Sequence, residues 1–116
     1  MFLTRWALGA LGLLGLLAAS PSGGSLTVTP DGLTAGAKAN VSYSNPSLAG
    51  QTVLVEVDNG NPFNTEYDYV TVDLDAAGNG TATWSVPESG WDEASFHAPD
   101  AQQIRLVILT PKPVVE

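Results

Sequence analysis

Residues 25–110 consist of short runs in which apolar and polar side chains alternate. In the run TVLVEVD (52–58), every second residue is a valine. A period of two sends successive side chains to opposite faces of an extended strand, whereas a helix would show a period of 3.6. No stretch of this region has the helical period, so the alternation predicts an all-β fold.

Seven such runs are separated by turn-forming residues. They are SLTVT (25–29), AKANVSYS (37–44), TVLVEVD (52–58), YDYVTVDL (67–74), TATWSV (81–86), ASFH (94–97) and IRLVILT (104–110). Short strands at regular spacing are typical of a sandwich of two antiparallel sheets.

Loop length predicts which strands share a sheet. We expect the tight loop at 75–80 to form a β-hairpin and the short turn at 99–102 to keep its two strands in one sheet. The longer loops at 45–50, 59–66 and 87–92 are expected to cross between sheets. Strands one, two, five and four would then form one sheet, and strands three, six and seven the other.

The N-terminal segment has the layout of a secretory signal peptide. Arg5 precedes an apolar run from Trp6 to Ala19, and small residues follow it. The run is shorter than the ~20 residues that span a bilayer. We therefore expect a signal peptide over 1–24, a β-sandwich over 25–110 and an extended tail over 111–116. Membrane contact would come only from an uncleaved signal segment.

Composition narrows the environment and the partners. The chain has no cysteine, which excludes a disulfide framework and thiolate chemistry. Twelve acidic residues give a formal net charge of −8, and such a surface repels nucleic acid and anionic membranes. We expect a secreted or cell-surface protein whose partners do not include nucleic acid.

The pattern resembles the immunoglobulin-like domains of bacterial cell-surface proteins. The likeness rests on LTVTP in the first run, AGAKANVSYS, AGQTVLVEV and VTVDLDAAGNGTATWSV, and it covers about residues 25–110. The chain lacks the cysteine pair of antibody domains. The resemblance implies a structural or adhesive role without catalysis.

The stretch DLDAAGNG poses a choice between a calcium site and a turn. Asp73, Asp75 and Asn79 offer the hard oxygen ligands that calcium takes. The glycines at 78 and 80 suit a tight loop, and the spacing and distal glutamate of an EF-hand are absent. We favour the turn and keep the three residues as weak calcium candidates. Asp58 with Asn61 is a second, weaker choice.

Catalysis and a metal cofactor are not expected. His97 is the single histidine, and without cysteine or a second histidine it does not suggest zinc. A hydrolytic triad would need His97 with Asp92 or Asp100 and a serine such as Ser89 or Ser95, but no nucleophile elbow is present. The sequence therefore predicts that the chain is not an enzyme.

Aromatic residues are candidates for the core or for ligand stacking. Trp84 alternates with small apolar residues and is expected in the core. Trp91 lies in a predicted loop, where it either plugs the end of the sandwich or is exposed to stack on a sugar. Tyr67 and Tyr69 have the parity of an outward-facing pair and are further stacking candidates.

The last run, IRLVILT, carries apolar side chains on both faces of the predicted strand. If Ile104, Leu106 and Ile108 fill the core, Val107 and Leu109 face outward, as does Leu54 in the third run. An apolar outer face predicts contact with another protein, and the alternatives are that the terminal PKPVVE folds back over it or that the exposed aliphatic residues have no role.

Two functions follow. The first is a secreted or cell-surface structural or adhesive module that forms part of an extracellular assembly such as a filament, with a second copy or another protein on the apolar face. The alternative is a soluble module that binds carbohydrate or protein through Trp91, Tyr67 and Tyr69.

Overall fold

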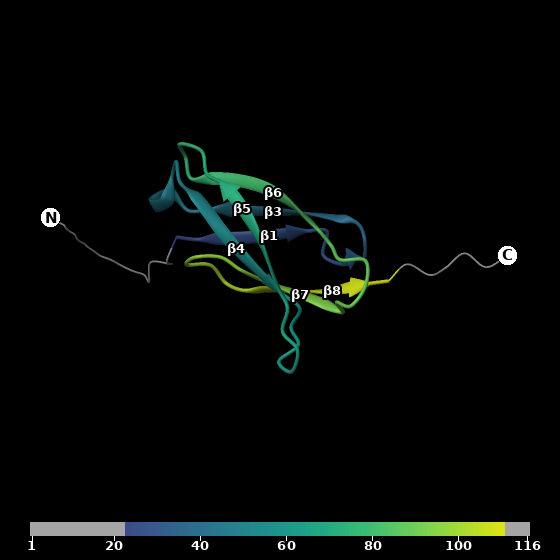
Figure 1. Cartoon of the computed structure of the whole chain (residues 1–116). Helices are drawn as coiled ribbons and strands as arrows, with labels where there is room; N and C mark the ends of the chain where they lie inside the picture. Colours follow the sequence, from purple (N-terminus) through teal and green to yellow (C-terminus); the bar gives the residue numbers. More distant parts are fainter. Residues whose placement is uncertain (1–22, 111–116) are drawn as a thin grey trace, which may run out of the picture.

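The computed structural model describes residues 23–110, which form an all-β fold of two sheets (Figure 1). The predicted signal peptide, apart from its last two residues, and the predicted tail at 111–116 lie outside the described residues. The strands are β1 (Ser25–Thr29), β2 (Leu33–Thr34), β3 (Lys38–Ser44), β4 (Thr52–Asp58), β5 (Tyr67–Asp73), β6 (Asn79–Ser85), β7 (Glu93–His97) and β8 (Ile104–Leu109). A 3₁₀ turn, η1 (Pro46–Leu48), follows β3. Within residues 23–110 no helix is long and apolar enough to cross a membrane.

The smaller sheet has the order β1-β3-β6 and the larger one β2-β8-β7-β4-β5. Every pairing is antiparallel except that of β2 with β8, which is parallel. The all-β prediction is confirmed. Seven of the strands fall on the seven predicted runs, and β2 is an additional strand of two residues.

The sheet assignment of β5 differs from the prediction. β5 and β6 were expected to form a hairpin in one sheet, but β5 pairs with β4 along its whole length, from Thr52 opposite Asp73 to Asp58 opposite Tyr67. The loop at 59–66 is therefore the hairpin connection, and the tight loop after β5 crosses between the sheets. The crossings at 45–50 and 87–92 and the β7–β8 turn are as predicted.

Backbone contacts explain how so short a loop changes sheets. Gly78 has a φ of +89°, a conformation that glycine adopts without strain. Its carbonyl accepts a hydrogen bond of 2.8 Å from the amide of Asn45, at the start of another crossing. The two crossing loops thus support each other, an interaction between distant parts of the chain that loop length does not reveal.

The core lies between the inner faces of the two sheets. Alternate valines of β4 and β5 pack against side chains of β1, β3 and β6. At one end, Trp84 lies 5.7 Å from Trp91 and 5.4 Å from Phe96 between ring centroids, the latter edge-on. Such tilted and edge-on pairs are the favoured aromatic geometries.

Candidate functional site

Two rows of side chains cross the outer face of the larger sheet. In the first row, Tyr67 on β5 pairs with Asp58 on β4, which pairs with Ser95 on β7. In the second row, Tyr69 pairs with Glu56, which pairs with His97. Directly paired residues place their Cβ atoms about 5 Å apart on one face. The register thus sets two aromatic rings beside two carboxylates and an imidazole.

The loop between β4 and β5 borders an open groove of about 380 Å³ next to these rows. Most of its lining residues have polar side chains; they are Asp58, Gly60, Asn61, Pro62, Thr65, Ser95, His97, Gln103 and Arg105. The hydrogen bonds of the loop are largely internal: the Asn61 carboxamide oxygen accepts from the amides of Phe63 and Asn64. An Asx turn of this kind gives the loop a defined conformation.

One side-chain contact and one ion pair order the polar groups of the groove. His97 Nε2 lies 2.8 Å from Asp58 Oδ2, and Arg105 Nε lies 3.1 Å from Glu93 Oε2. Arg105 also donates to the hydroxyl of buried Ser95. The histidine thus bonds to a strand aspartate, and Ser95 is buried.

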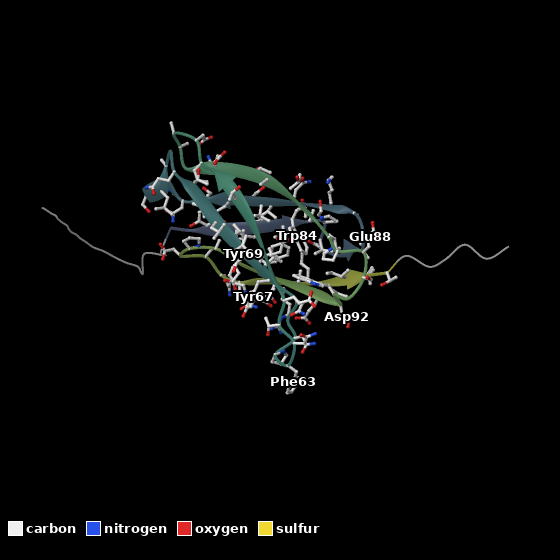
Figure 2. The ribbon with its side chains drawn as sticks, in the orientation of Figure 1. Phe63, Tyr67, Tyr69, Trp84, Glu88 and Asp92 are labelled. Carbon is white, nitrogen blue, oxygen red and sulfur yellow. The ribbon has the colours of Figure 1, made fainter. Side chains whose placement is uncertain are left out.

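The exposed aromatic residues gather at the same side of the molecule. Tyr67 is 57% exposed and Tyr69 52%, and both rings stand on the outer face of β5, the edge strand of its sheet. Phe63 is 96% exposed at the far end of the loop, beyond both sheets (Figure 2). Tyr67 and Tyr69, two residues apart on one face of β5, present exposed rings on which a ligand can stack, whereas Phe63 stands apart from them (Figure 2).

The prediction that Trp91 stacks on a ligand is wrong. This residue is only 8% exposed, its ring packs on Trp84, and its Nε1 donates a 3.0 Å hydrogen bond to Glu66. A ring enclosed in this way cannot stack on a ligand. Trp91 instead closes the end of the core, which was the other interpretation of its position.

The calcium candidates are not brought together as a ligand set. Asp75 Oδ1 accepts from the amides of Ala77 and Asn79, which lowers the pKa of its carboxyl. Asp73 accepts from the Thr52 hydroxyl, and Asn79 from the Ser44 hydroxyl. The Oδ1 atom of each of these three side chains is used in a turn or a cross-strand bond. For the second choice, Asp58 Oδ1 accepts from the Gly60 amide and Asn61 is engaged within its loop.

The predicted apolar interface is divided. Leu54, Val107 and Leu109 are all exposed on the outer face of the larger sheet. The register, however, sets Leu54 six residue rows from Val107, about 20 Å along the strands. The polar rows with Glu56 and Asp58 lie between them. Val107 and Leu109 form one small patch, and Leu54 lies apart beside β5.

Sequence reasoning missed Glu56, Phe63 and Arg105 as parts of this surface and assigned His97 no role. The sequence did contain a pattern that points to Glu56: it is two residues from Asp58 in a strand, so the two carboxylates share a face. The approach of His97 depends on which strands are neighbours and on their register, and the groove depends on the conformation of an eight-residue loop.

Comparison with known proteins leaves the family open. No protein-family model matches the chain, and no curated protein matches its sequence. Similar solved structures include the alkylpurine DNA glycosylase AlkC of Pseudomonas fluorescens, bound to DNA containing an abasic-site analogue, with 9% identity and a TM-score of 0.42 over 75% of this chain and 30% of that one. Another is an engineered protein with 21% identity and a TM-score of 0.42 over 83% of this chain and 22% of that one. The chain thus spans less than a third of either structure.

Proposed function

We propose that this chain is an extracellular, immunoglobulin-like adhesive module that binds carbohydrate on the outer face of β4, β5 and β7. The observation that carries the proposal is the placing of exposed Tyr67 and Tyr69 directly beside Asp58 and Glu56. The strand order supports the immunoglobulin-like assignment, since β5 takes the place beside β4 that an added strand takes in variable-type domains.

The chemistry of the surface suits a sugar. A pyranose ring presents an apolar face of C–H groups and an equatorial rim of hydroxyls. Tyrosine rings offer a rigid apolar platform for the first. Asp58, His97 and Gln103 in the adjoining groove offer acceptors and donors for the second. An apolar platform with a few convergent polar groups is the usual composition of a small-ligand site.

The negative charge of this face favours neutral over acidic sugars. Glu56, Asp58 and Glu93 all lie on this face, while Arg105 is already paired with Glu93. The protein as a whole carries a formal charge of −8. A uronate, sulfate or sialic acid brought to this surface would meet like charge. The ligand expected here is therefore a neutral glycan.

A glycan array of the full chain tests the proposal. We expect binding to neutral glycans, lost in the double variant Tyr67→Ala/Tyr69→Ala and retained in Leu109→Ala, which alters an exposed residue of the same sheet outside the groove. Circular dichroism checks that both variants are folded. An array that shows no glycan bound, or equal binding by the double variant, would refute the proposal.

Self-assembly into a filament is a second candidate, favoured by one observation. Val107 and Leu109 form an exposed patch on β8, and among residues 23–110 the strand paired on the side of β8 away from β7 is the two-residue β2, which covers only Ile108 and Leu109. The remaining edge of β8 offers backbone groups for a strand of another copy. Sedimentation velocity of wild type and Leu109→Glu tests this, and a wild type that stays monomeric at every concentration contradicts it.

A further inference from the structure

We propose that Glu56, Asp58 and His97 form a binding site for a divalent transition metal ion, with zinc as the best fit. One donor atom from each side chain lies within 4.8 Å of the other two. The site shares Asp58 and His97 with the groove, and a bound metal goes beyond the carbohydrate function proposed above.

The scaffold holds the three donors on one face. Glu56 and Asp58 alternate with buried valines on β4, and Glu56 is directly paired with His97 on β7. Both strands lie in the interior of the five-stranded sheet, and all three residues are partly buried. Sites on rigid, neighbouring strands keep their geometry better than sites on loops.

Charge within the cluster favours a cation. A single imidazole, even when protonated, cannot neutralise two carboxylates. Arg105, the cation that lines the same groove, is paired with Glu93 at 3.1 Å. A divalent ion would balance both carboxylates, which would otherwise repel each other on the same strand.

The donor set selects the metal. One imidazole nitrogen with two carboxylate oxygens suits zinc, whereas calcium prefers six to eight oxygen ligands. Tetrahedral zinc with ligand distances of about 2.1 Å needs donors about 3.4 Å apart. His97 Nε2 and Asp58 Oδ2, now 2.8 Å apart, must separate slightly to hold the ion, and the Glu56 carboxylate lies within 4.8 Å of both. Three protein ligands leave a fourth position open toward the groove.

The test uses the absence of any other histidine in the chain. Untagged full chain, stripped with EDTA, is titrated with zinc chloride alone by calorimetry and by nitrogen-15 NMR of the imidazole. We expect a 1:1 complex in which the ring signals of His97 shift at stoichiometric zinc. His97→Gln and Asp58→Asn should each weaken binding at least about tenfold, while Glu88→Gln, an exposed carboxylate that does not line the groove, should retain it.

Two results would overturn the site. One is an imidazole signal that does not move when zinc reaches one equivalent, and the other is equal affinity in His97→Gln and wild type. Circular dichroism of the variants excludes unfolding as the cause of a loss. The glycan array, run with and without EDTA, reports on the carbohydrate proposal separately, so either proposal can fail while the other stands.

Discussion

The indole Nε1 of Trp84 on β6 donates a hydrogen bond of 2.8 Å to Asp68 on β5. This bond joins the edge strands of two different sheets. Trp84 is buried, and its ring contacts Trp91 and Phe96 in the core. Asp68 therefore satisfies the polar atom of a core side chain and fixes β5, the strand that presents Tyr67 and Tyr69.

Replacing Asp68 by alanine should lower the free energy of unfolding by about 1 kcal/mol, because the buried indole N–H loses its acceptor. Asp68→Asn keeps an acceptor oxygen and should lose less. Urea denaturation followed by tryptophan fluorescence measures both. Asp31→Ala, in an exposed turn, serves as the control, and an Asp68→Ala protein as stable as this control would disprove the role.

Gly50 and Gly78 both have a positive φ, so replacing each by alanine gives two variants that can be compared directly. Gly50 has a φ of +79° with open space around a Cβ atom, so Gly50→Ala should cost only the backbone strain of about 1 kcal/mol. A Cβ atom on Gly78 would lie 2.6 Å from the Asn45 carbonyl oxygen, within the supporting contact of the two crossing loops. Gly78→Ala should therefore cost at least about 2 kcal/mol more than Gly50→Ala. Equal midpoints of urea denaturation for the two variants would contradict this.

Asp75 should give the turn after β5 a pH dependence. The amides of Asn79 and Ala77 bond to its carboxylate and lower its pKa in the folded state. Because the pKa of Asp75 is lower in the folded than in the unfolded state, its carboxylate stabilises the fold at pH values above the pKa of the unfolded state. This contribution is lost as the pH falls through the pKa of the folded state. Asp75→Ala should melt a few degrees below wild type at pH 7, and the gap should close below about pH 4. A gap that persists at pH 2 would exclude the charge as its cause.

Trp91 should matter for stability and not for recognition. Trp91→Ala removes a buried ring and should destabilise the protein by about 3 kcal/mol, whereas Trp91→Phe keeps much of the packing and should cost less. Glycan binding by the folded Trp91→Phe protein should equal that of wild type. A selective loss of binding in this variant, with the fold intact, would return Trp91 to the ligand site.

The alternation of side chains was enough to predict most of the strands, because each strand has one buried face. It could not predict the partner of β5. A short loop follows β5 and a longer loop precedes it, so loop length alone favoured β6 as the partner of β5, whereas the actual partner is β4. The short loop crosses because the amide of Asn45 meets the carbonyl of Gly78, a contact between residues 33 positions apart in the sequence.

The site was predictable only in fragments. The outward parity of Tyr67 and Tyr69 follows from the valines beside them, and so does that of Leu54. The sequence does not show that Leu54 and Val107 are six rows apart, because register is set by pairing across three strands. The approach of His97 to Asp58 depends on the same register and was missed for the same reason.

The most direct measurement is an NMR titration of the full chain with the neutral oligosaccharide that the array binds most strongly, compared with an acidic analogue. We predict shifts confined to Glu56, Asp58, Tyr67, Tyr69 and His97 and the loop between β4 and β5, with no response to the acidic sugar. Shifts centred on Val107 and Leu109, or an equal response to the acidic sugar, would contradict a carbohydrate site on this face.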